Sequence, residues 1–130
     1  MAIPIASHPV TIDHKGRNVS ARYDASVSIE TRQIGVAMSI RPGTQRCSWR
    51  AVVKVGRHVE GSSLPARIVA TDTSQQGSIA GDCRQLRTNI EREVARRAPA
   101  IQQRVAAIAE QDRDVLLAEV NSTTTLAGNG

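Results

Sequence analysis

The sequence predicts an α+β fold, an antiparallel sheet of four to five strands with one long C-terminal helix, kinked near Pro99, packed on one face. Two observations lead to it. Apolar residues recur at every second position through residues 19–29, as in a half-buried strand, and about every 3.6 positions after residue 82, as in an amphipathic helix. The chain also has two cysteines, Cys47 and Cys83, one in each of these parts.

At 130 residues the chain is long enough for one domain with a single core. We assign the domain to residues 1–120, with a β meander in 1–80, the long helix in 82–120 and a flexible tail in 121–130. The chain has no Phe, one Trp and one Tyr, so Ala, Val and Ile must fill the core. These small side chains favour a thin core between sheet and helix over a deep ligand cavity.

The first strands are predicted on either side of a turn at residues 14–16. In residues 19–29 one face is apolar and the other polar, which is typical of an antiparallel sheet with one wet face. Residues 10–13 can pair with this strand through the turn. Pro4 and Pro9 make that first segment an edge strand, because proline has no N–H to donate to a second neighbour.

Three further segments complete the predicted meander. Alternation resumes through residues 36–40 and ends at a turn in 41–44. The strand in residues 47–55 places its cysteine and the tryptophan on one face, which we assign to the core. The last strand falls in residues 64–70, and residues 71–81 are polar and glycine-containing, which predicts a loop.

The helix is predicted to begin at Asp82, which suits an N-cap, with Gln85 three residues later in the capping-box position. Pro99 interrupts the apolar stripe. The stripe keeps its phase across the proline in steps of seven residues, which favours a kinked helix, or two nearly collinear helices, over a helical hairpin. The stripe consists of Leu86, Ile90, Val94, Ile101, Val105, Ile108, Val115 and Leu116.

The helix is longer than the strands that it covers. As a straight helix residues 82–120 would span ~58 Å, whereas a strand of about 11 residues spans ~37 Å. The apolar stripe beyond Pro99 therefore needs a cover, either the same sheet or another subunit. Basic side chains gather in the first half of the helix and acidic ones in the second, which would suit antiparallel pairing with a second copy. The candidate helix interface is Ile101, Val105, Ile108, Val115 and Leu116.

The cysteines predict a disulfide, because Cys47 lies on the core face of its strand and Cys83 would start the helix that docks there. Closing a loop of about 37 residues would stabilise the fold by ~4 kcal/mol in the chain-entropy model. Such a bond implies an oxidising compartment. Two alternatives remain open: two reduced, buried thiols, or a nucleophilic Cys83 whose base would be a histidine.

No catalytic, metal or cofactor pattern stands out, so we expect a protein that is not an enzyme and needs no cofactor. The three histidines are scattered, and neither cysteine has a CxxC or HxxxH companion. Asp112 and Asp114 are two residues apart on a helix and so point to different faces. No GxGxxG or P-loop pattern occurs.

The net charge of +5 raises the question of an anionic partner. Residues 1–80 carry ten basic and five acidic side chains, which accounts for all of it. The alternative is ordinary cross-strand pairing of these bases with Asp24 and Glu30. We rank nucleic acid below a protein partner, because the chain has few aromatic rings on which bases could stack. The candidate anion-binding face is Arg22, Arg50, Lys54 and Arg67.

These observations predict a small exported protein, periplasmic or secreted, that binds a protein partner or itself. The alternative is a cytoplasmic, basic nucleic-acid-binding protein. The first residues lack the basic and apolar regions of a signal peptide, so we expect any export signal to have been removed upstream of Met1. No stretch is apolar enough to predict a transmembrane segment.

Overall fold

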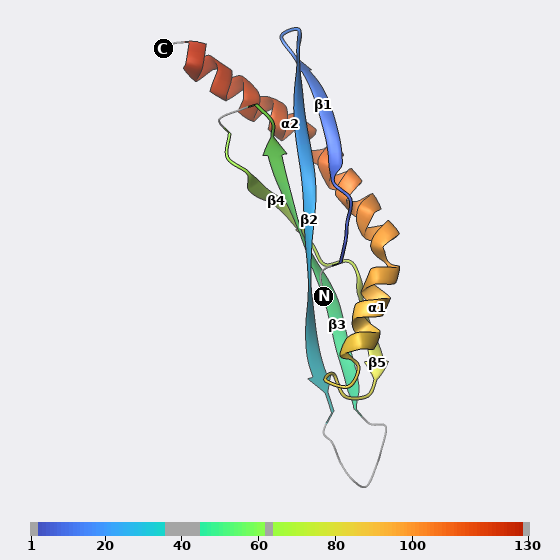
Figure 1. Ribbon diagram of the computed structural model, residues 1–130. Coiled ribbons are helices and arrows are strands. Elements are labelled where there is room, and N and C mark those ends of the chain that lie inside the picture. The colour runs from blue at the N-terminus through green and yellow to red at the C-terminus, as the bar shows by residue number, and fades with distance from the viewer. Residues whose placement is uncertain (1–2, 36–44, 62–63, 129–130) are drawn as a thin grey trace.

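The computed structural model describes residues 3–35, 45–61 and 64–128. The strands form an antiparallel sheet, and a long C-terminal helix packs against it, which confirms the predicted fold class (Figure 1). The elements are β1 (His8–His14), β2 (Arg17–Ile34), β3 (Arg46–Val59), β4 (Arg67–Asp72), β5 (Gln76–Ala80), α1 (Arg87–Arg96) and α2 (Ala98–Gly128).

The sheet runs in the order β1-β2-β3-β4, and β5 also pairs with β3. β4 and β5 lie end to end along the same edge of β3, and between them the Ala51 N–H donates to the carbonyl of Gln75 at 2.8 Å. The loop predicted for residues 71–81 is therefore wrong. β5 is short and mostly polar, so its own sequence carries no strand pattern, and its conformation depends on pairing with β3.

The β1–β2 hairpin is confirmed, and its turn is tight. Lys15 and Gly16 have positive φ angles of 54° and 78°, which suits a two-residue turn whose twist matches that of the strands. Among the described strands β1 pairs only with β2, and Pro9 is accommodated on this edge as predicted. The strand and turn predicted for residues 36–40 and 41–44 lie outside the described residues.

The helix breaks at Arg97, between α1 and α2. Pro99 then occupies the first turn of α2, where its missing N–H needs no intrahelical partner, so the predicted interruption takes the form of two successive helices. The prediction that Asp82 is the N-cap of the helix is wrong, because the N-cap position of α1 is occupied by Leu86. The Asp82 side chain instead accepts the Arg84 N–H at 2.7 Å, in the turn that precedes α1. α2 continues through residues 121–128, where the sequence predicts a tail.

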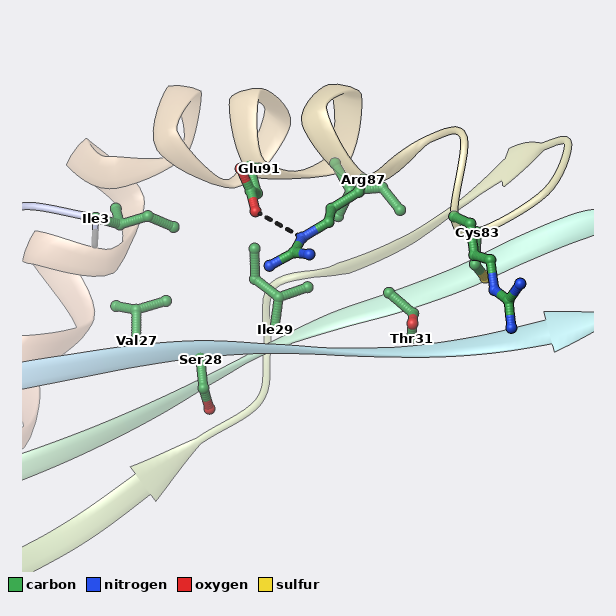
Figure 2. A pocket seen from close by; sticks show the side chains of 10 residues that line it. Ile3, Val27, Ser28, Ile29, Thr31, Cys83, Arg87 and Glu91 are labelled. Carbon is green, nitrogen blue, oxygen red and sulfur yellow. Dashed lines mark hydrogen bonds and ion pairs between the residues drawn. The ribbon is translucent and has the colours of Figure 1, made fainter. Parts of the chain in front are cut away.

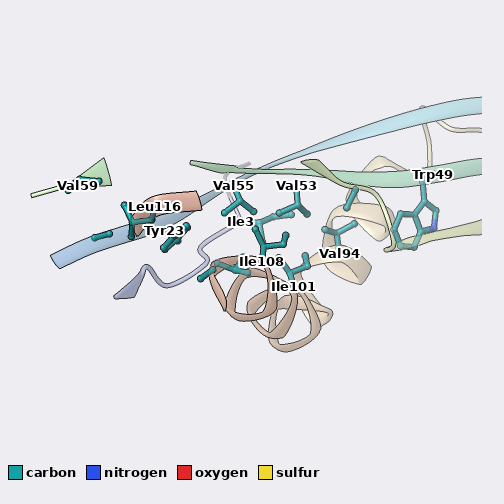
Figure 3. Close-up of a cluster of buried hydrophobic side chains, with 14 of the residues drawn as sticks. Ile3, Tyr23, Trp49, Val53, Val55, Val59, Val94, Ile101, Ile108 and Leu116 are labelled. Carbon is teal, nitrogen blue, oxygen red and sulfur yellow. The ribbon is translucent and has the colours of Figure 1, made fainter. Parts of the chain in front are cut away.

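The core lies between one face of the sheet and the two helices (Figure 3). α1 lies beside β5, and α2 continues from it diagonally across this face toward the opposite end of the sheet, as Figure 1 shows. Of the five residues in the candidate helix interface, Ile101, Val105 and Leu116 are fully buried and Ile108 is 6% exposed. The sheet of the same chain is thus the cover for this stripe. Val115 alone among the five is exposed.

Trp49 is the largest side chain of this core and fits because its cross-strand neighbour is Gly77. The Arg97 guanidinium lies 4.8 Å from the centroid of the indole ring, a cation–π contact. A Cβ atom at Gly77 would lie 2.9 Å from three atoms of the indole ring. The glycine is therefore required by close packing.

Replacing Gly77 with alanine should destabilise the protein by about 1–3 kcal/mol, because the buried indole must move. The measurement is the midpoint of urea unfolding. Gly56→Ala is the matched control, since a Cβ there meets nothing closer than 3.7 Å. Equal midpoints for the two variants would contradict the close packing of Trp49.

Candidate functional site

The predicted disulfide between Cys47 and Cys83 is present, and it joins β3 to the turn that precedes α1. The two Cα atoms are 5.0 Å apart, and 36 positions separate the residues in the sequence. Cys47 is fully buried on the core face of β3. The bond therefore fixes the N-terminal end of the helical region to the sheet, and neither cysteine retains a thiol.

Gln33, near the end of β2, fastens the same turn from the other side. Its side-chain oxygen accepts the Cys83 N–H at 2.7 Å, and its Nε2 donates to the carbonyls of Arg46 and Gly81 at 3.1 Å each. Three parts of the chain thus meet at one side chain. The turn before α1 is held covalently to β3 and by hydrogen bonds to β2.

A groove of about 430 Å³ lies between β2 and α1, next to this fastened turn (Figure 2). Val27, Ile29 and Thr31 point from β2 toward the helix, and Arg87 and Glu91 point from α1 toward the strand. The two helical side chains form an ion pair at 3.3 Å. We call this hollow the β2–α1 groove; it is lined by Ile3, Val27, Ser28, Ile29, Thr31, Cys83, Arg84, Arg87, Ile90 and Glu91.

A buried ionic cluster lies at the other end of the sheet, beneath α2. Arg57 points from β3 into the core and is paired with Asp112 at 2.5 Å and with Glu119. The Tyr23 hydroxyl donates to Asp112 at 2.7 Å, and Arg67 pairs with Glu119 at 3.0 Å. The cluster ties β2, β3 and β4 to one side of α2 (the Arg57 side chain is only 2% exposed).

Two pKa values in this cluster are shifted by its environment. Burial lowers the pKa of Arg57, but its hydrogen bond and charge interaction with Asp112, with a further contribution from Glu119, outweigh this and raise the pKa overall. Burial raises the pKa of Tyr23, and its hydrogen bond to Asp112 raises it further. The arginine therefore stays charged and the phenol stays protonated, so the cluster is a structural ion pair with a neutral hydrogen-bond donor.

The sequence does contain signals for this cluster. Arg57 lies two residues beyond Val55 in the core-facing register of its strand, and Asp112 lies seven residues after Val105 on the apolar helix stripe. A charged residue in each apolar pattern suggests that the two meet. A comparison of Asp112 with Asp114 alone does not reveal the ion pair, because the partner of Asp112 is Arg57, on β3.

The residues of the candidate anion-binding face do not form one free cationic patch. Arg50 pairs with Glu30 across β2 and β3 at 2.7 Å, which is the cross-strand pairing weighed as the alternative, and Arg22 pairs with Asp24 on its own strand at 2.9 Å. Arg67 is opposite Arg57 in the β3–β4 register and so belongs to the core-facing side of the sheet. Lys54 remains on the outer face. Anion binding itself stays a prediction.

Asp72, at the end of β4, links the sheet to α2 through a second buried carboxylate. It accepts hydrogen bonds from the Ser74 hydroxyl at 2.6 Å and from Arg104 at 3.2 Å. Burial raises the pKa of Asp72, but the Ser74 and Arg104 interactions outweigh it, so the pKa lies below its usual value. Its stabilising contribution is therefore present above the unfolded pKa of about 4 and is lost as the pH falls through the lowered folded pKa.

Asp72→Asn should cost about 1–2 kcal/mol at pH 7, because hydrogen bonds to a charged group are replaced by neutral ones. The difference from the wild type should shrink toward pH 2, because the Asp72 carboxylate takes up a proton as the pH falls through its lowered pKa. Urea unfolding at the two pH values measures this, with the exposed Asp114→Asn as the control. A difference that does not change with pH would contradict the assigned interaction.

Neither a metal site nor a membrane-spanning helix is found in residues 3–35, 45–61 and 64–128. Within these ranges no three histidine, cysteine, aspartate or glutamate side chains are grouped to hold a metal ion. No helix there combines the length and apolar content needed to cross a bilayer. No protein-family model, curated protein or solved structure matches this chain.

Proposed function

We propose that this protein is an exported, non-enzymatic binding protein, periplasmic or secreted, held in shape by its disulfide. The single observation that carries the proposal is the bond between Cys47 and Cys83. Structural disulfides form and persist mainly in oxidising compartments, whereas cytoplasmic thiols are kept reduced. A bond that anchors a helix to a sheet is typical of a structural disulfide.

Binding is favoured over thiol catalysis because both sulfur atoms are consumed in the bond. A nucleophilic cysteine needs a thiolate, an adjacent base and access to substrate. Cys47 is fully buried and bonded, and Cys83 is bonded to it. The alternative of a nucleophilic Cys83, which the sequence left open, is thus without support.

Binding along the sheet is favoured over self-association through α2. The apolar stripe that suggested a second copy packs instead on the sheet of the same chain, with Leu116 fully buried. Of the candidate helix interface, only Val115 is exposed, at 45%. A single exposed valine is a normal feature of a protein surface.

Nucleic-acid binding has less support than protein binding. Arg22 and Arg50, on the outer face of the sheet, are each engaged by a carboxylate, which reduces the charge available to phosphates. Trp49 is 3% exposed and Tyr23 is fully buried, so neither ring can serve as a stacking platform for bases.

Fractionation of the source cells tests the proposal. The full-length protein, produced from its own gene with all upstream codons, should appear in the periplasmic or secreted fraction, with a cytoplasmic enzyme as the marker for leakage. Recovery with the cytoplasmic marker would contradict export. In a separate mobility-shift assay at low salt, binding of DNA or RNA that weakens as salt rises would favour the nucleic-acid alternative instead.

A further inference from the structure

We infer that the β2–α1 groove binds an extended peptide segment of another protein, one carrying apolar and acidic side chains, as an added antiparallel strand on the edge of β2. The inference rests on the proposed binding function and names the site and the kind of partner. It depends on three features of the groove: an unpaired strand edge, an apolar lining and arginines at its rim.

Among the residues that the structure describes, no strand pairs with the outer edge of β2 along the groove. β1 pairs with β2 only as far as Tyr23, whose partner is His8, whereas β3 follows β2 to its end at Ile34. No backbone hydrogen bond joins the outer edge of residues 25–34 to any described residue. Unpaired N–H and C=O groups along a strand edge are the usual template for an added strand.

The ladder itself identifies which backbone groups face the groove. The Ser20 carbonyl accepts the Glu60 N–H at 2.9 Å, so the backbone groups of Ser20 point toward the β3 side. In an antiparallel ladder without a bulge, successive residues alternate in direction, and the β2–β3 register has no shift. The outward backbone groups therefore belong to Ala25, Val27, Ile29, Thr31 and Gln33.

The same alternate residues turn their side chains toward α1. Val27 and Ile29 are half-buried and point toward α1 (Figure 2), and Ile90 lines the same groove, so an incoming strand would find apolar contacts on its core-facing side. Ile3 closes the groove at one end. At the other end, the disulfide and the hydrogen bond from the Cys83 N–H to Gln33 hold the turn before α1 in place against the sheet. A groove held rigidly at its ends loses little entropy when a ligand is ordered in it.

The rim of the groove is basic. Arg84 forms no ion pair with any described residue, and the side chain of Arg87 is 80% exposed even though it pairs with Glu91. An acidic side chain on the added strand, opposite Thr31, would lie beside these arginines. This charge favours an acidic partner. A second copy paired edge to edge about a two-fold axis near Thr31 would instead place Arg84 and Arg87 close to their own counterparts, which repel.

The probe for this site is a fluorescein-labelled peptide of about seven residues with the order Thr-Val-Thr-Glu-Thr-Val-Thr. In an extended strand, which rises ~3.3 Å per residue, its Val and Glu side chains lie on one face and its Thr side chains on the other. Fluorescence anisotropy on the oxidised full-length chain should show saturable binding. A peptide with Lys in place of Glu should bind about fivefold more weakly. Equal binding of both peptides, or none of either, would overturn the inference.

Backbone methylation distinguishes strand addition from simple adhesion to an apolar groove. In an added antiparallel strand, the residues whose side chains face α1 also direct their N–H groups to β2. N-methylation at the Glu and both Val positions should therefore weaken binding about tenfold or more, whereas N-methylation at the intervening Thr positions should leave it nearly unchanged. Equal sensitivity at both sets would contradict strand addition.

Two protein variants locate the site. Thr31→Pro removes one outward N–H while leaving the β3 side of the ladder intact, and it should abolish binding, with Thr31→Val as the matched control. Arg87→Glu, on an exposed side chain, should reverse the preference so that the Lys peptide binds better. The second variant keeps the test decisive if the proline destabilises the strand, and an unchanged preference in it would overturn the inference.

Light scattering separates a second copy from a foreign peptide. A dimer that Thr31→Pro dissociates, and that the Glu peptide displaces, would overturn the inference because the edge would be self-paired. A negative result in the peptide or light-scattering experiments would not contradict the proposal that the protein is exported. Conversely, cytoplasmic recovery of the protein would overturn the proposed function without changing the peptide measurements.

Discussion

Removing the disulfide should lower the free energy of unfolding by about 4 kcal/mol, because the unfolded chain regains the entropy of a loop of about 37 residues. Domains of this kind have a total stability of only about 5–15 kcal/mol, so the loss is a large fraction. Wild-type protein unfolded in urea with and without a reductant measures the effect with no change of side chain.

Cysteine variants separate the bond from the packing. Cys83→Ala removes the bond at a half-buried site, whereas adding Cys47→Ala also empties a fully buried one. The single variant should resemble the reduced wild type, and the double variant should be less stable by a further increment. A loss below about 1 kcal/mol on reduction would contradict a stabilising role for the bond.

Asp112→Ala should destabilise the protein by about 3 kcal/mol, since it leaves the buried Arg57 with fewer opposite charges and removes the acceptor of the Tyr23 hydroxyl. Thermal and urea unfolding measure the loss. Asp114→Ala, an exposed neighbour on α2, should change stability by less than about 0.5 kcal/mol and serves as the control.

Replacing Tyr23, Arg57 and Asp112 together by apolar residues should cost much less than removing the Asp112 carboxylate alone. A triple variant with Tyr23→Phe, Arg57→Met and Asp112→Leu leaves Glu119 paired with Arg67 and exchanges a buried ion pair for apolar contacts. Such exchanges are often neutral or stabilising. The triple variant should therefore be more stable than Asp112→Ala. The opposite order would contradict the view that an uncompensated charge causes the loss.

The long elements were predictable because their patterns are strong and local. The alternation in residues 19–29 predicted β2, and the phase kept across Pro99 predicted helical structure on both sides of it. β5 was not predictable, because its five residues form a strand only through pairing with β3. The start of α1 was also missed, since the turn before it is held by Gln33, a residue 50 positions from Cys83 in the sequence.

The candidate sites depend even more on long-range contacts. The two cysteines were predictable as a pair, because only two exist and each lies in a different part of the fold. The β2–α1 groove was not, since it arises where β1 ends before β2 does, a register that no local pattern reveals. Arg67 was assigned to the wrong face because the β3–β4 register shifts between Val55 and Gly56.

The redox state of the two cysteines in the native source is the most direct measurement. Protein collected from its own cells into acid, alkylated without reductant and analysed as an intact molecule should be unmodified, with a mass about 2 Da below that of the dithiol. Peptide mapping should recover Cys47 linked to Cys83. Two alkylated thiols in the native protein would contradict both the covalent link between sheet and helix and the oxidising compartment inferred from it.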